Sequence, residues 1–165
     1  LSSLKIKNKI GIEIDHLAAK NASKFCKIYN IDLNKNLKIN EKFDLVVCYH
    51  VIEHIQNPIV FIKNIKKIMK KNALLIIGTP DFDSAMARHY KSKYRLLHDH
   101  THISLFSLDS MSRLLRDMNF KIKKIDFPYF DTEYFSKKNL LKLLSNQKVS
   151  PPFYGSFMTF VVKKF

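Results

Sequence analysis

The feature that most constrains this chain is the stretch FDLVVCYHVIEHIQNP at residues 43–58, in which an apolar run ends abruptly in a polar turn. Residues 45–48 are uninterrupted apolar residues, a pattern typical of a parallel strand that is covered on both faces. His50, Glu53 and His54 follow directly. Because ligands of open α/β sheets bind outside the carboxyl ends of the strands, the stretch predicts a ligand-facing corner in an α/β fold.

The next segment predicts an amphipathic helix. Asn57 is a suitable N-cap, and Pro58 suits the first helical position because its missing N–H costs nothing there. We expect Asn72 to end this helix in a left-handed conformation, which Asn tolerates well. The apolar stripe expected to face the core comprises Ile59, Phe61, Ile62, Ile65, Ile68 and Met69.

The remaining elements alternate between strands and helices, which implies a parallel sheet with helices on both faces. The last two strands lack a long amphipathic crossover, so we expect an antiparallel strand at an edge of the sheet. With no repeat or linker, residues 1–165 are expected to form one domain. The further strands are expected at residues 9–14, 28–31, 74–77, 121–126 and 157–162, and the further helices after Asp15, from Ser107 to Met118 (ended by Asn119), and at residues 136–144.

The net charge and the cysteines indicate the cellular compartment but do not identify a binding partner. The net charge of +15 comes from 29 Lys and Arg against 14 Asp and Glu. The lysines are spread over nearly every element rather than gathered in a stripe, which argues against a nucleic-acid partner. The aliphatic runs are too short to cross a bilayer. Cys26 and Cys48 lack metal-type spacing, so we expect a reduced, cytoplasmic setting.

Residues 43–54 closely resemble motif IV of class I S-adenosylmethionine-dependent methyltransferases. Other segments resemble this family in the same order along the chain, and the resemblance extends over roughly residues 4 to 163. It implies a Rossmann-like class I methyltransferase sheet that is mostly parallel with an antiparallel last strand. The supporting segments are residues 11–15 (GIEID), 29–33 (YNIDL), 72–80 (NALLIIGTP), 102–107 (HISLFS) and 150–155 (SPPFYG).

The resemblance also implies S-adenosyl-L-methionine as the cofactor, with specific residues around it. Glu13, at the end of a strand, would accept hydrogen bonds from both ribose hydroxyls, since a carboxylate offers two oxygens to a diol. Asp32 and its neighbours would flank the adenine, and His50 would lie near the methionine part. The cofactor-binding residues implied are Glu13, Ile14, Asp32, Leu33, Tyr49 and His50.

One part of the family pattern is missing. The chain has three glycines, Gly11, Gly78 and Gly155, and none lies in a glycine-rich cofactor loop. Aligned to the family, Leu1 falls in the helix after that loop, so the first strand and the loop are expected to be absent. We therefore expect a partial methyltransferase domain that binds the cofactor poorly by itself. Either a longer methyltransferase or an inactive relic would explain this pattern.

The polar turn also offers candidates for catalysis. His54 and His102 are the candidate general bases. The segment around His102 is expected to cover the acceptor-binding site. In some quinone-biosynthesis O-methyltransferases that resemble this family, the Glu and His of this motif are thought to hold a divalent ion. Glu53 and His54 are thus weak metal candidates, although Glu53 can equally brace the following helix, and we expect no metal.

The function expected from these residues is methyl transfer to an oxygen or nitrogen of a small-molecule acceptor. The sulfonium already carries an activated methyl group, so the protein mainly aligns the reactants. Two alternatives remain open: an RNA-modifying methyltransferase, suggested by the basic charge, and a catalytically inactive protein that keeps the fold. The acceptor itself cannot be read from the residues, because its determinants lie in loops without a recognisable motif.

Overall fold

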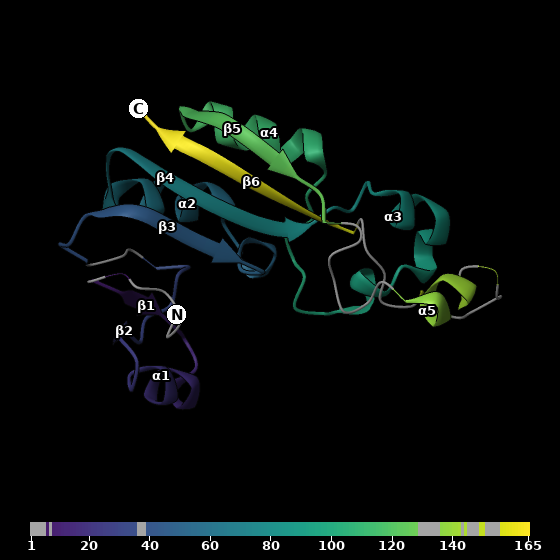
Figure 1. The fold of residues 1–165 in the computed structure, drawn as a ribbon, viewed down its shortest axis with the longest axis horizontal. Helices are drawn as coiled ribbons and strands as arrows, with labels where there is room; N and C mark the ends of the chain where they lie inside the picture. The colour runs from purple at the N-terminus through teal and green to yellow at the C-terminus, as the bar shows by residue number, and fades with distance from the viewer. Residues whose placement is uncertain are drawn as a thin grey trace. The chain divides into compact units, whose positions relative to one another are not determined.

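The computed structural model describes residues 6, 8–35, 39–128, 136–142, 144, 149–150 and 156–165. The chain divides into two compact units, Leu1–Ile39 and Asn40–Phe165. Figure 1 shows the elements of both. That residues 1–165 form one domain stays a prediction.

The first unit is a strand–helix–strand arrangement. Strand β1 (Ile10–Ile12) pairs in parallel with β2 (Lys27–Tyr29), and α1 (His16–Ala22) connects them. The carboxylate of Asp15 accepts a hydrogen bond from the backbone N–H of Ala18 at 2.6 Å and so caps α1. The two predicted strands and the helix between them are confirmed, although both strands are shorter than expected.

The second unit contains a four-stranded sheet in the order β3-β4-β6-β5. Strand β3 pairs in parallel with β4, whereas β6 is antiparallel to both of its neighbours. The antiparallel last strand is confirmed. The four strands are β3 (Phe43–Tyr49), β4 (Met69–Pro80), β5 (Phe120–Asp126) and β6 (Phe157–Lys164).

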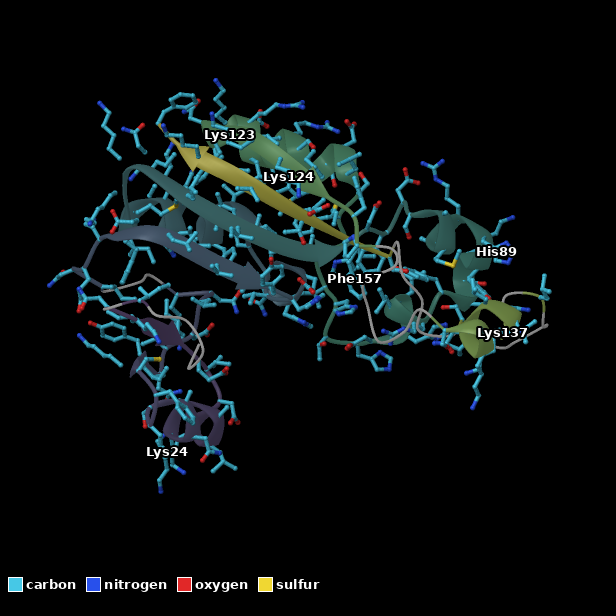
Figure 2. All side chains as sticks on the ribbon, in the orientation of Figure 1. Lys24, His89, Lys123, Lys124, Lys137 and Phe157 are labelled. Atoms are coloured by element: carbon cyan, nitrogen blue, oxygen red, sulfur yellow. The ribbon has the colours of Figure 1, made fainter. Side chains whose placement is uncertain are left out.

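The expected place of β6 at an edge is wrong, because β6 lies between β4 and β5. Alternate residues of β6, beginning with Met158 and Phe160, are fully buried, so one face of this strand lies in the core. Strand β5 instead exposes Lys123 and Lys124 (Figure 2), and charged lysines suit an edge strand because they oppose pairing with another chain.

Helices α2 (Pro58–Ile68) and α4 (Leu108–Asp117) lie on the same face of this sheet (Figure 1). The expectation of helices on both faces concerns the sheet of the whole chain and stays a prediction. Right-handed crossovers that advance in one direction along a sheet place their helices on one side, and β3, β4 and β5 advance in that way. The opposite face of β3 carries the exposed side chains Leu45, Val47 and Tyr49.

The core lies between the sheet and these two helices. Leu75 and Ile77 of β4 pair with Val162 and Phe160 of β6, and all four are completely buried. The buried helix residues that meet this face include Phe61, Ile62, Ile65, Met111 and Leu115. The predicted stripe of α2 is confirmed except at Ile59, which is 47% exposed, and Met69, which is buried but belongs to β4.

The helix starts are as predicted, but one helix end is not. Asn57 caps α2 by accepting a hydrogen bond from Val60, and Ser107 caps α4. Asn119 follows α4 in a left-handed conformation with φ 56°, as expected. Asn72 is also left-handed, with φ 63°, but it lies inside β4 rather than at the end of α2. The helix stops earlier because Met69 is already extended, and the left-handed residue falls in an irregular part of the β3–β4 pairing.

The segment between β4 and α4 contains a short helix and two 3₁₀ turns rather than an extended loop. These elements are α3 (Ala85–Tyr90), η2 (Lys91–Lys93) and η3 (Arg95–His98). Tyr90 and Tyr94 form a small cluster with Leu96 there. The predicted short helix near residue 140 is present as α5 (Lys137–Lys142), while residues 151–155 of the predicted final hairpin lie outside the described residues. Within the described ranges, no helix has the length and apolar character needed to cross a bilayer.

Candidate functional site

The polar corner begins at His50, directly after β3. This residue has φ 53°, and its backbone N–H donates a hydrogen bond to the carbonyl of Gly78 at 3.0 Å. A positive φ is uncommon for a residue other than glycine and costs on the order of 1 kcal/mol, so the surroundings must hold it. Gly78 contributes by lacking a side chain, since a Cβ there would overlap the ring of Tyr49. The chain is thereby turned sharply at the carboxyl ends of β3 and β4.

Glu53 is the centre of the corner and is completely buried in the 3₁₀ turn η1 (Ile52–His54). Its Oε1 lies 3.2 Å from Nδ1 of His50, and its Oε2 accepts a hydrogen bond from the hydroxyl of Thr79 at 3.0 Å. Its backbone carbonyl accepts two further bonds, from the N–H groups of Ile103 and Ser104. Glu53 thus connects the ends of β3 and β4 with the segment that leads into α4.

Glu53 is ionised at neutral pH. Burial alone would raise its pKa, but hydrogen bonds from His50, from its own backbone N–H and from Thr79 together lower the pKa below its ordinary value. Only half of the His50 side chain is buried, with 53% exposed. Its ring also meets the ring of Phe157 edge-on, with centroids 4.9 Å apart. Figure 2 labels Phe157 at the beginning of β6.

A second pair of imidazoles lies beside Glu53. The rings of His54 and His102 have centroids 5.0 Å apart. Nδ1 of His54 is 3.0 Å from the carbonyl oxygen of Thr101, and Nδ1 of His102 is 2.8 Å from that of Leu96. Because a carbonyl can only accept, Nδ1 must carry the hydrogen in both rings, and each Nε2 then offers its lone pair.

Glu53, His54 and His102 each offer a possible metal-ligating atom, and these atoms lie within 4.8 Å of one another. Both carboxylate oxygens of Glu53, however, already take part in hydrogen bonds, to His50 and Thr79. An ion would have to compete with these partners for a completely buried carboxylate. That these residues hold no metal stays a prediction.

The cofactor residues predicted in the first unit follow its two strands. Oε1 of Glu13, just after β1, accepts a hydrogen bond from the backbone N–H of Asp15 at 2.9 Å. Asp32, beyond β2, accepts hydrogen bonds from the backbone and the side chain of Asn34, and the first of these bonds lowers its pKa. A carboxylate has about four acceptor positions, so both groups retain capacity for further donors.

The structure brings four predicted residues together in the second unit: His50, Glu53, His54 and His102. Tyr49 precedes this corner and is 52% exposed, whereas Glu13, Ile14, Asp32 and Leu33 belong to the first unit. A crevice shared by Glu13 and the His50–His54 turn stays a prediction, as do the individual cofactor contacts.

Sequence reasoning missed Thr79 and Phe157. A signal for Thr79 was available, because it is the first polar side chain after the buried strand predicted at residues 74–77. Phe157 had no such signal, since its approach to His50 depends on where β6 enters the sheet.

This fold and the polar corner at its strand ends define a Rossmann-like methyltransferase architecture. A family model described as a methyltransferase domain matches residues 9–125. The chain belongs to this methyltransferase family, whose methyl donor is S-adenosylmethionine.

Two curated proteins and one solved structure illustrate the similarity. An uncharacterized protein of Methanocaldococcus jannaschii is 28% identical over 114 residues, which are 68% of this chain and 56% of that protein. A ubiquinone biosynthesis O-methyltransferase of Glaesserella parasuis is 44% identical over 39 residues, covering 24% of this chain and 16% of that enzyme. The chain thus spans about half the length, or less, of these relatives.

The solved structure shows the fold. It is an S-adenosylmethionine-dependent methyltransferase of Thermotoga maritima, described as a possible histamine N-methyltransferase. It superposes with a TM-score of 0.71 at 21% identity, covering 95% of this chain and 73% of that one. The predicted fold class is confirmed.

Proposed function

We propose that the protein carrying this chain transfers a methyl group from S-adenosylmethionine to an oxygen or nitrogen of a small-molecule acceptor. The observation that carries the proposal is the group formed by His50, Glu53, His54 and His102 at the carboxyl ends of β3 and β4, in a chain of the methyltransferase family. The names of the relatives support a small acceptor, since one acts in ubiquinone biosynthesis and another is a possible histamine N-methyltransferase.

In this proposal the chain's residues bind and orient, while the bound cofactor supplies an already activated methyl group. Glu13 and Asp32, with Ile14 and Leu33, hold the nucleoside, and Tyr49 and His50 border the methionine part. His54 and His102 face the acceptor side. Their Nε2 atoms carry lone pairs, so either imidazole can take a proton from a bound hydroxyl or amine.

A reduced, cytoplasmic setting belongs to the same proposal. Cys26 and Cys48 are both free thiols. Burial raises the pKa of the Cys48 thiol to about 12, which keeps this thiol protonated and unreactive at neutral pH.

The test uses the intact protein with S-adenosylmethionine and a panel of phenols, catechols and small amines. Formation of S-adenosylhomocysteine together with a methylated acceptor, both measured by mass spectrometry, is the expected result. A structured RNA is included in the panel. Methylation of the RNA alone would favour the RNA-modifying alternative, and calorimetry without any binding of S-adenosylmethionine would favour an inactive protein that keeps the fold.

A further inference from the structure

His50 differs from the other imidazoles of the corner because its Nδ1 lies 3.2 Å from a completely buried carboxylate, whereas the carboxylate facing His102, that of Asp99, is about half exposed and 3.7 Å from Nε2. We propose that His50 and Glu53 act as an imidazole–carboxylate pair, in which Glu53 positions the ring and Nε2 of His50 takes the proton of the acceptor. This inference rests on the proposed function and assigns the proton transfer to one residue. It moves the general base from His54 and His102 to a residue that the sequence placed only beside the cofactor.

The hydrogen bond to Glu53 determines which nitrogen of the His50 ring carries the hydrogen. An ionised carboxylate only accepts, so the contact of 3.2 Å between Oε1 of Glu53 and Nδ1 of His50 places the ring hydrogen on Nδ1. Nε2 is then the basic atom. When Nε2 takes up a proton, the positive imidazolium lies directly against the negative charge of Glu53, which stabilises it.

Glu53 is well suited to a positioning role because it cannot move easily. It is completely buried, Thr79 holds its second carboxylate oxygen, and the N–H groups of Ile103 and Ser104 hold its backbone carbonyl. A carboxylate that is fixed in this way orients the ring that it contacts. The left-handed backbone of His50 serves the same end, since it turns the side chain back toward Glu53 three residues later.

His50 also differs from the neighbouring imidazoles in how far its side chain is exposed to solvent. The side chain of His50 is 53% exposed, whereas that of His102 is only 8% exposed. Nδ1 of both His54 and His102 meets a neutral carbonyl, which orients a ring but stabilises its charged form less than a carboxylate does. The Asp99 carboxylate lies 3.7 Å from Nε2 of His102, the atom that would have to face an acceptor. Among the described residues, His50 thus combines an accessible ring with an ionised partner.

The proton transfer balances without any further reactant. The acceptor loses its proton to Nε2 of His50, and its electron pair forms the new bond to the methyl carbon. The electron pair of the broken carbon–sulfur bond stays with sulfur, which gives S-adenosylhomocysteine. Glu53 remains ionised throughout, and His50 returns its proton to water after the product leaves.

The first experiment measures the ring of His50 in the intact protein and needs no acceptor. Nitrogen-15 NMR of the imidazole distinguishes the two tautomers. We expect the Nδ1-protonated tautomer in the unmodified protein, and in Glu53→Gln a larger share of the Nε2-protonated tautomer, because an amide can donate to Nδ1 whereas a carboxylate only accepts. Ser104→Ala is the matched control, since it removes a hydroxyl bonded to the carbonyl of Ile55 in the same segment and leaves the pair intact.

The second experiment measures catalysis once an acceptor is known. His50→Gln should lower kcat by about 100-fold or more, the usual contribution of a general base, and change the KM for S-adenosylmethionine only a few-fold. Glu53→Gln should lower kcat together with the share of the Nδ1-protonated tautomer of His50. A His50 ring protonated on Nε2 in the unmodified protein, or a tautomer unchanged in Glu53→Gln, would overturn the pair even in an active enzyme. A correctly paired His50 in a protein that transfers no methyl group would overturn the proposed function alone.

Discussion

Replacing Thr79 by valine removes one hydroxyl from the buried corner and leaves the shape of the side chain almost unchanged. Thr79 is completely buried, and its hydroxyl donates to Oε2 of Glu53 at 3.0 Å. A hydrogen bond to a charged group contributes about 1.5–3 kcal/mol, and the additional methyl group of valine returns somewhat less than about 1 kcal/mol. We therefore expect Thr79→Val to lower the free energy of unfolding by about 1–2 kcal/mol at pH 7.

The measurement is urea unfolding of the intact protein, followed by circular dichroism at several pH values. With a typical slope of about 2 kcal/mol per molar urea, the midpoint should fall by about 0.5–1 M. Thr79→Ser is the matched control, because it keeps the hydroxyl and loses only a methyl group. Its cost, about 1 kcal/mol for one buried methyl group, should not depend on pH.

The pH dependence of the free energy of unfolding distinguishes Thr79→Val from Thr79→Ser. The pKa of Glu53 is lowered in the folded protein, so its stabilising contribution is complete above about pH 4.3, the ordinary value of Glu, and is lost as the pH falls through the folded pKa. The difference between the unmodified protein and Thr79→Val should therefore be largest near neutral pH and shrink in acid. A loss that is constant with pH, or a double-mutant cycle with Glu53→Gln that shows no coupling at pH 7, would refute the assigned hydrogen bond.

Three further predictions concern the second unit. Ser107→Ala should lower the free energy of unfolding by about 1 kcal/mol in thermal melts, because Ser107 and Ser110 form a reciprocal capping box at the start of α4; a loss much smaller than that of Ser110→Ala would contradict it. Asn119→Ala should cost about 1 kcal/mol, whereas Asn119→Gly should not, since the residue has φ 56°. At pH 8 the thiol of Cys48, with a pKa of about 12, should be alkylated at least about 100-fold more slowly in the folded protein than in urea, as followed by mass spectrometry of its peptide; equal rates would exclude its burial.

Much of the local structure could be predicted because the signals are carried by neighbouring residues. Asn57 followed by Pro58 identifies the start of α2, and Ser107 identifies that of α4, since caps satisfy backbone donors within the next turn. The polar turn after residues 45–48 was predicted for the same reason. A strand end and the side chains that follow it are adjacent in the chain.

The remaining features depend on contacts between residues that are far apart in the sequence. The alternation of buried residues in β6 predicts a strand but does not say which strands it joins, so its place between β4 and β5 was missed. The bond from Thr79 to Glu53 likewise needs the parallel register of β3 and β4. Asn72 was placed at a helix end because its left-handed preference fits a helix end as well as an irregular strand pairing, and local sequence does not distinguish them.

The place of β6 also sets the order in which the sheet can assemble during synthesis. Strand β5 leaves the ribosome before β6, and its one neighbour in the described sheet is not available until residues 157–164 have followed, since β6 lies between β5 and β4. Until then, β4 and β5 present unpaired backbone edges that invite aggregation or capture by a chaperone. A ribosome that stalls just before residue 157 would therefore hold a nascent chain in which β5 is not paired with the β3–β4 sheet. Residues 157–164 join these strands into one sheet.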